Sequence, residues 1–525
     1  MSSKNKYSYT YPLLFSIAVA VGMLIGYKLH SNMPISKSFF TTKEKNSLDE
    51  VLGIIQKRYV DKINTDSTAE LAIQTVLSSL DPHSNYIPAS ALMEMNEDIE
   101  GQFEGIGVEF NIFSDTVHLL SVLKNGPSAK AGLNIGDKII KVNDSSAIGI
   151  KNSDQFKKWV KGPSGSVVNL TILRNGKLIS KDIIRGNIPI SSVDAAYTIE
   201  KETGYIRLNR FSANTYREFM IEMEKLNTQG IKNLIIDLRD NGGGILDEAV
   251  NIADEFISGD KLIVYTEGIN SPRKDYKAKR PGIFENGKVI ILLNENSASA
   301  SEVLAGALQD HDRATIVGRK SFGKGLVQEQ FSLSDGSALR LTTARYYTPL
   351  GRSIQKSYSE GAAKYHQNFI NRIHNSNADS SSIGNSKVFK TTGGKILYER
   401  DGITPDIIVE RDKITYDSLI FKLYENNLLG NFSYRKFINE KAIIGQLKNP
   451  EALSAFLSDK NKLMNELISF AKNQGIILPI YNEQETNFIH TRIIAQIARI
   501  SWGDNAYFNY VNKNDNTFKM ALESF

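Results

Sequence analysis

The first hydrophobic feature of the chain is an uncharged run at residues 11–27, YPLLFSIAVAVGMLIGY. At about 1.5 Å per residue a helix of this length spans roughly 25 Å, which approaches the thickness of the hydrocarbon core of a membrane. No A-x-A-like cleavage site follows the run. We therefore expect residues 1–30 to form a signal-anchor, rather than a cleaved signal peptide or a buried helix, and residues 31–46 to form a polar linker.

The next segment, residues 47–100, has apolar residues at helical spacing. Two S-x-x-E sequences, Ser47–Glu50 and Ser67–Glu70, each precede such a run and are typical of N-terminal capping boxes. This pattern predicts a small helical N-terminal domain.

From residue 101 the hydrophobic period shortens to that of strands. Residues 101–187 contain short β-type runs separated by Gly, Pro and Asn turns, which predicts a β-rich domain. Over residues 188–410, continuous apolar runs such as Leu234–Leu238 and Val289–Asn294 alternate with helical segments. Continuous apolar strands are typical of a parallel sheet that is buried on both faces, so this pattern predicts an α/β unit.

The last region, residues 411–525, carries apolar side chains at helical spacing, on one face over residues 453–470 and on a second face over residues 489–500. We expect a helical C-terminal region. Its faces could form a homodimer, shield the site or pack on the protein's own core, and the sequence leaves these alternatives open. An adaptor protein is a further possible partner of the chain. A polar, low-complexity stretch at residues 374–388 predicts a mobile loop.

Composition narrows the classes of function. Of the 525 residues, 41% are hydrophobic and 23% are charged, which are the proportions of globular domains. The 63 Lys and Arg residues exceed the 58 Asp and Glu residues by only +5, and without a basic block this charge predicts no nucleic-acid partner. The chain has no cysteine, which excludes disulfides, thiolate metal sites and a cysteine nucleophile.

The segment NENSASASEVLAGALQD, residues 294–310, is the first candidate for chemistry. A buried strand ends in small residues and a helix begins at once, so a serine hydroxyl can stand at a helix N-terminus. There the free N–H groups and the helix dipole stabilise a developing oxyanion. The alternative is that Ser297, Ser299 and Ser301 are only helix caps.

A second candidate is the segment GRKSFGKGLVQ, residues 318–328. It approaches the P-loop pattern G-x-x-x-x-G-K-[ST], but Gly325 stands where the Mg²⁺-binding hydroxyl belongs, and the following sequence predicts a β-hairpin instead of a helix. Lys324 is then either a solvated loop residue or a lysine whose pKa is lowered in an apolar pocket, so that it can serve as a base.

Glycines 242–244 follow a buried strand in LIIDLRDNGGGIL, and glycines let a backbone approach a ligand closely. None of the seven histidines lies in a G-x-S-x-G or H-E-x-x-H context. The sequence therefore predicts no histidine-based triad and no metal site.

Taken together, these segments resemble the C-terminal processing peptidases, or tail-specific proteases, which are Ser/Lys-dyad serine peptidases with a PDZ domain. The resemblance runs from about residue 47 to residue 410. It rests on the motifs SLDPHSNYI, FEGIGVEF, GPSAKAGLNIGDKIIKVN, YIRLNRFS, LIIDLRDNGGGIL, NENSASASEVLAGALQDHDRATIVGRKSFGKGLVQ and DGITPDI. So many motifs in one order are far more specific than any single glycine or serine pattern.

The resemblance implies the roles of five residues. Ser299 takes the position of the nucleophile, Lys324 that of the general base, and Gln328 that of the residue that orients the lysine amine. Gly244 and Ala300 take the positions whose backbone N–H groups form the oxyanion hole. No metal and no cofactor are implied.

The resemblance also implies a site for the substrate's tail in the PDZ domain, where a C-terminal carboxylate binds to backbone N–H groups and the peptide adds as a strand. Gly105, Ile106, Gly107 and Val108 match the carboxylate-binding loop and the start of the peptide-pairing strand. Arg174 lies near the position of an arginine that links substrate binding to activity.

The sequence thus predicts a multidomain α/β protein, in which a PDZ-like β-rich domain is inserted before an α/β peptidase core, with a helical N-terminal unit and a helical C-terminal region. We expect a serine endopeptidase that binds protein substrates with exposed C-terminal tails and cleaves them through an acyl-enzyme. We also expect it to be anchored in the inner membrane by its N-terminal helix, on the exported side of the cell envelope. The alternatives are a catalytically silent PDZ scaffold, a P-loop NTPase and a hydrolase of small esters.

Overall fold

The computed structural model of the chain describes residues 12, 14–23, 47–113, 115–200, 202–374, 387–399, 401–412, 418–425 and 427–525. The chain divides into two compact units, Met1–Ile73 and Gln74–Phe525. The predicted linker at residues 31–46 and most of the predicted mobile loop lie outside the described residues. The predicted domain boundaries stay predictions.

The first unit contains a helix at residues 14–23, α2 (Ser47–Arg58) and the beginning of α3 (Thr65–Leu80). The capping box predicted at Ser67 is wrong, because Ser67 lies inside α3 and its N–H donates to the Asn64 side chain. Among the described residues, none of the helices is long and apolar enough to cross a membrane. The anchor predicted over residues 1–30 stays a prediction.

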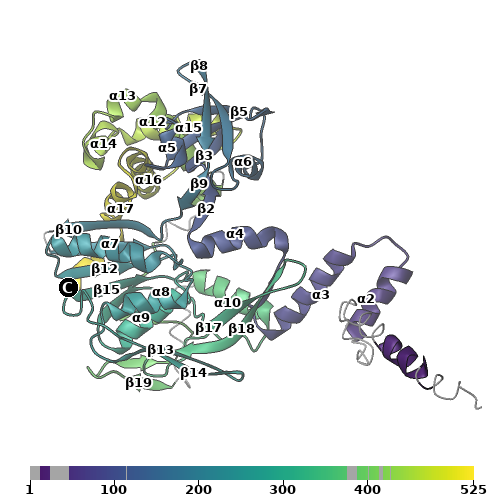
Figure 1. Cartoon of the computed structure of the whole chain (residues 1–525). Helices are drawn as coiled ribbons and strands as arrows, with labels where there is room; N and C mark the ends of the chain where they lie inside the picture. Colours follow the sequence, from purple (N-terminus) through teal and green to yellow (C-terminus); the bar gives the residue numbers. More distant parts are fainter. Residues whose placement is uncertain are drawn as a thin grey trace, which may run out of the picture. The chain divides into compact units, whose positions relative to one another are not determined.

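The second unit contains a central sheet of mainly parallel strands (Figure 1). Its strands, in spatial order, are β10 (Val193–Glu200), β11 (Thr203–Leu208), β12 (Asn233–Asp237), β15 (Lys288–Leu293), β16 (Ala314–Gly318) and β21 (Ile407–Ile408). The strands from β11 to β21 run parallel, and β10 joins β11 in the antiparallel sense. The α/β unit predicted from the continuous apolar strands is confirmed.

Both faces of the central sheet are covered, as its apolar strands require. One face packs on α7 (Thr215–Thr228), α8 (Leu246–Asp254) and α9 (Ala300–Asp310). The other face packs on α17 (Asp504–Asn512) and α18 (Asn516–Glu523). The last helices of the chain therefore complete the core around the central sheet.

A second sheet brings the segment that follows α3 beside the segment that carries Lys324. Its strands, in spatial order, are β1 (Asn85–Ile87), β18 (Ala338–Tyr347), β13 (Leu262–Gly268) and β14 (Ser271–Lys277), with β17 (Leu326–Ser332) also paired to β18. β17 and β18 form the hairpin that the sequence after Gly325 predicts. The same unit also contains α4 (Ala89–Glu100), α10 (Ala362–His374) and the antiparallel pair of β19 (Val388–Lys390) and β20 (Ile396–Tyr398).

The predicted PDZ-like domain contains a sheet in the order β3-β4-β5-β7-β8, with β6 paired to β5. Its elements are β3 (Val108–Phe113), β4 (Thr116–Val122), α5 (Pro127–Lys130), β5 (Lys138–Val142), β6 (Ser145–Ser146), α6 (Ser153–Val160), β7 (Val167–Arg174) and β8 (Lys177–Ile184). The antiparallel ribbon of β2 (Gln102–Gly105) and β9 (Gly186–Pro189) carries the chain into and out of this domain.

The C-terminal region has a hydrophobic core of its own. Its helices are α11 (Ser418–Glu425), α12 (Leu428–Asn439), α13 (Lys441–Ile444), α14 (Pro450–Phe456), α15 (Lys460–Lys472) and α16 (Glu483–Trp502). The face predicted over residues 453–470 is divided between two helices, because α14 ends at Phe456 and the Asp459 side chain caps the start of α15. The face predicted over residues 489–500 lies on α16, where Ile489, Ile493 and Ile497 are fully buried.

Candidate active site

The candidate nucleophile lies on the turn between β15 and α9. Two of the three neighbouring serines, Ser297 and Ser301, are fully buried, and their hydroxyls donate to the carbonyl oxygens of Leu238 at 2.8 Å and Asn241 at 2.9 Å. Ser299 is only half-buried and has a φ of 53°, which is uncommon and strained for a residue with a Cβ. The flanking hydroxyls therefore hold the turn, and Ser299 is the serine of the three that is available for chemistry.

Two backbone N–H groups beside this turn can bind an oxyanion. Gly244 has a φ of 144° and Ala300 is the first residue of α9; within the described residues, neither N–H has an acceptor. The neighbouring Gly243 approaches the turn so closely that a Cβ there would lie 2.8 Å from both the Ala300 nitrogen and the Ser299 Cβ. This contact explains why the NGGG turn needs more than one glycine.

Lys324 lies on the loop between β16 and β17. Its Nζ donates to Gln328 Oε1 at 2.8 Å, and Gln328 Nε2 donates to the His83 carbonyl oxygen at 2.6 Å. Burial lowers the pKa of Lys324 from its ordinary value of 10.5, and the positive charge of Arg340 lowers this pKa further. A lysine must be neutral to act as a general base, and both effects favour the neutral amine.

A buried carboxylate that the sequence did not single out connects the backbones of these two candidates. Glu302 Oε2 accepts from the N–H of Ser299 at 2.8 Å and from the N–H of Lys324 at 2.9 Å. Its Oε1 accepts from the Gly323 N–H and the Ser321 hydroxyl. Burial raises the pKa of Glu302 to about 7, although all four hydrogen bonds favour the ionised form. The S-x-x-E spacing of Ser299 and Glu302, which is that of a capping box, could have revealed this residue.

The carbonyl groups of the same two residues share a second partner, Tyr346 of β18. The Tyr346 hydroxyl contacts the carbonyl oxygen of Ser299 at 3.0 Å and also that of Lys324. Burial raises the pKa of Tyr346 well above its ordinary value, so the hydroxyl keeps its proton and donates. Ser299 and Lys324 are therefore held together through their backbones, and no direct hydrogen bond between their side chains is present among the described residues.

The DPHS motif, residues 81–84, contacts the site through a backbone carbonyl group. Asp81 Oδ1 accepts from the N–H groups of His83 at 2.7 Å and Ser84 at 2.8 Å, and this turn presents the His83 carbonyl oxygen to Gln328. Burial and the charge of Lys324 lower the pKa of His83 to about 4, so its ring is neutral near pH 7. His83 is thus a turn residue, and its carbonyl oxygen fixes the orientation of the Gln328 amide.

The residues predicted to bind the tail lie together, except for Arg174. Gly105 ends β2, Ile106 and Gly107 form the connection, and Val108 begins β3. β3 is an edge strand, which pairs only with β4 within the described residues. Arg174 lies on β7, which β4 and β5 separate from β3 in the sheet, and its guanidinium binds the Asp137 carboxylate through two contacts of 2.6 Å.

Comparison with known proteins identifies the family of the chain. Three family models match the chain: peptidase family S41 at residues 202–362, a PDZ domain at residues 105–184, and a family of unknown function at residues 419–503. A carboxy-terminal-processing protease of Bartonella bacilliformis is 35% identical over 333 residues, which cover 61% of this chain and 76% of that protein. The chain belongs to peptidase family S41.

A probable CtpA-like serine protease of Staphylococcus epidermidis is 30% identical to the S41 peptidase over 90% of this chain and 96% of that protein. Among solved structures, a photosystem II D1 C-terminal processing protease covers 70% of this chain and 87% of its own, at 25% identity and a TM-score of 0.38. The family models and the two bacterial relatives show that the S41 peptidase is a serine-type peptidase with a PDZ domain, and the predicted family and fold class are confirmed.

We expect the substitution Arg340→Gln to move the pH dependence of the S41 peptidase. It removes a positive charge that lowers the pKa of Lys324, so this pKa rises and the neutral amine forms only at higher pH. The acidic limb of a plot of kcat/KM against pH should then shift to higher pH. Arg345→Gln, on the same strand, is the control and should leave the limb in place; an unmoved limb in Arg340→Gln would contradict the electrostatic role of Arg340.

The substitution Glu302→Gln should lower kcat/KM while the protein stays folded. The amide keeps one oxygen, but its NH₂ group would face backbone N–H donors, so the turn and the loop shift relative to each other. A displacement of about 1 Å in an active site costs on the order of 100-fold in rate. Peptide hydrolysis and thermal unfolding are measured together, with Glu329→Gln on the exposed side of β17 as the control. Unchanged activity in Glu302→Gln would show that the carboxylate does not position the site.

Proposed function

We propose that the S41 peptidase is an endopeptidase that uses Ser299 and Lys324 as a catalytic dyad. The Lys324 amine takes the proton of the Ser299 hydroxyl as Oγ attacks the scissile carbonyl carbon. The N–H groups of Gly244 and Ala300 bind the resulting oxyanion. The Lys324 ammonium then gives its proton to the leaving amine, which produces an acyl-enzyme. Water attacks this ester with Lys324 again as the base, and Ser299 is restored.

One observation carries this proposal: a single carboxylate oxygen, Glu302 Oε2, binds the backbone N–H groups of both Ser299 and Lys324. The two residues come from separate loops, yet they share a buried partner. Gln328 also orients the Lys324 amine. A neutral amine has two N–H bonds and one lone pair, so donating one N–H to Gln328 directs the lone pair elsewhere, and Gln328 is itself fixed by the His83 carbonyl.

For the substrate, we infer a protein with an exposed, unstructured C-terminal tail. The open edge of β3 is free to pair with an added strand, and the loop at Gly105–Gly107 precedes it at the position where a PDZ domain binds a terminal carboxylate. We also propose that the N-terminal apolar segment directs the S41 peptidase to the exported side of the cell envelope and anchors it there.

The dyad is tested with Ser299→Ala, Lys324→Ala and Lys324→Arg. Each variant should lose at least about 10⁴-fold of its peptidase activity, since neither nucleophile nor base has a substitute. Lys324→Arg should be inactive because a guanidinium stays protonated. Circular dichroism and thermal unfolding establish that each variant is folded, and an active, folded Lys324→Ala enzyme would refute the dyad.

Recognition of the tail is tested by comparing one model protein with a free C-terminus and with an amidated C-terminus. Amidation removes the carboxylate that the loop at Gly105–Gly107 would bind, so kcat/KM for the protein should fall. Hydrolysis of a short capped peptide, which has no carboxylate in either case, serves as the reference for dyad activity. Equal cleavage of the free and amidated proteins would contradict the tail-binding role of the PDZ domain.

A further inference from the structure

Within the described residues, the PDZ domain of the S41 peptidase is attached to the peptidase core in two separate ways. The first attachment is the β2–β9 ribbon, beside which Lys161 of the PDZ domain forms an ion pair of 2.5 Å with Glu97 of α4. The second attachment is indirect and runs through the C-terminal region. A domain held by a two-stranded ribbon alone can swing about it as a hinge, whereas a second attachment elsewhere removes that freedom.

The C-terminal region binds one face of the tail-pairing strand β3. The ring of Phe113 stacks on Tyr434 of α12, with centroids 5.1 Å apart and planes inclined by 14°. Two residues earlier on β3, the Asn111 side chain donates to the Asn431 side chain of α12. Ile135, on the loop before β5, packs against the hydrophobic core of the C-terminal region.

The same face of β3 continues at Glu109, which forms an ion pair of 3.2 Å with Arg499 of α16. Residues 109, 111 and 113 share a face because successive side chains of a strand alternate. The opposite face carries Phe110, whose ring packs edge-on against Phe156 of α6 at 4.5 Å. The C-terminal region therefore holds the back of β3 and leaves the pairing edge of the strand open.

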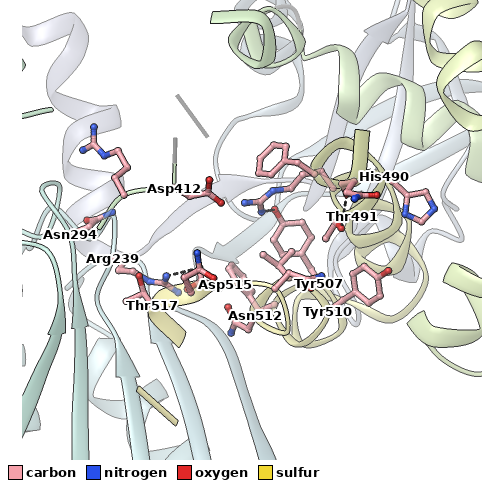
Figure 2. A pocket seen from close by; sticks show the side chains of 18 of the residues that line it. Arg239, Asn294, Asp412, His490, Thr491, Tyr507, Tyr510, Asn512, Asp515 and Thr517 are labelled. Carbon is pink, nitrogen blue, oxygen red and sulfur yellow. Dashed lines mark hydrogen bonds and ion pairs between the residues drawn. The ribbon is translucent and has the colours of Figure 1, made fainter. Parts of the chain in front are cut away.

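The other end of the C-terminal region is docked on the peptidase core. Phe518 of α18 lies in the hydrophobic cluster on the second face of the central sheet, and Asn512 of α17 donates to the Tyr197 hydroxyl of β10 at 2.8 Å. Asp515 forms an ion pair of 2.7 Å with Arg239. The pair lies beside a cavity of about 810 Å³ that is lined by residues of the peptidase core and of the C-terminal region (Figure 2). Arg239 directly precedes the turn that carries Gly244.

We propose that residues 419–525 form a strut that fixes the distance between the tail-binding strand β3 and Ser299. An extended peptide advances about 3.3 Å per residue, so a swing of the PDZ domain by about 10 Å would change the cleaved bond by about three positions. With the strut in place, the S41 peptidase cleaves an unstructured tail at a set number of residues from its terminal carboxylate. The inference rests on the proposed function. It assigns a role to residues 419–503, which match the family of unknown function.

The experiment uses the full-length S41 peptidase with the substitution Tyr434→Ala, which removes the ring that stacks on Phe113. The substrate is a folded reporter protein with an unstructured, repetitive tail, in which neighbouring bonds are chemically alike. Mass spectrometry gives the cleaved position. The wild type should cut at one dominant position, and Tyr434→Ala should spread its cuts over about three neighbouring bonds, the number that a displacement of about 10 Å covers. Hydrolysis of a short capped peptide should be unchanged.

Two matched variants separate loss of the strut from general damage. Tyr434→Phe keeps the stacked ring, and Phe421→Ala removes an exposed ring elsewhere in the C-terminal region; both should keep the single dominant position. Where Tyr434→Ala does not fold, the pair Asn431→Ala and Arg499→Ala removes the polar contacts to β3 instead and should also spread the cuts.

The outcomes distinguish this inference from the proposed function. A wild-type enzyme that does not cleave the tail contradicts the proposed function itself. Cleavage by the wild type at many positions, or a single unchanged position in folded Tyr434→Ala, overturns the strut and leaves the Ser/Lys dyad untouched.

Discussion

The candidate active site depends on one buried carboxylate. Glu302 is fully buried, and a carboxylate in that position is tolerated only when its lone pairs are satisfied. All four of its donors come from the nucleophile turn and the Lys324 loop, so the loop cannot leave the turn without exposing a buried charge to an empty space. Burial disfavours the charge of Glu302, as its raised pKa shows. Separating the two loops would remove the hydrogen bonds that offset this penalty, so Glu302 keeps the loops together.

In this arrangement opposing effects act on the pKa of Lys324, and burial is the largest of them. An ionised Glu302 and the nearby Asp81 raise the pKa of Lys324, and a raised pKa would keep the amine protonated and useless as a base. Removal from water and the charge of Arg340 act in the opposite direction and prevail. Glu302 accepts four hydrogen bonds, one of them from the backbone N–H of Lys324. Among the described residues it forms no ion pair with the Lys324 amine.

The sequence could predict what local patterns determine, and contacts between distant segments explain the rest. Periodicity predicts the parallel strands and the hairpin after Gly325, and both are confirmed. It could not choose among Ser297, Ser299 and Ser301, because the choice depends on carbonyl groups of Leu238 and Asn241 that belong to another loop. The role of Tyr346 could not be predicted from the sequence for the same reason, because its hydroxyl contacts the carbonyl oxygens of Ser299 and Lys324, which lie on other segments. The errors at Ser67 and after Phe456 arose where a nearby Asn or Asp side chain provides the cap instead.

The C-terminal region shows that an apolar pattern can correctly predict a buried strand without indicating which segment of the chain packs on it. The continuous apolar run at Leu234–Leu238 requires cover on both faces of the sheet, but nothing in that run says which segment provides the second cover. The structure assigns it to α17 and α18, which bury Ile235, Ile290 and Val317. The same region completes the core at one end and contacts β3 at the other. A swing of the PDZ domain about its ribbon would therefore have to break either the contacts at Phe113, Asn111 and Glu109 or the contacts of α17 and α18 with the central sheet.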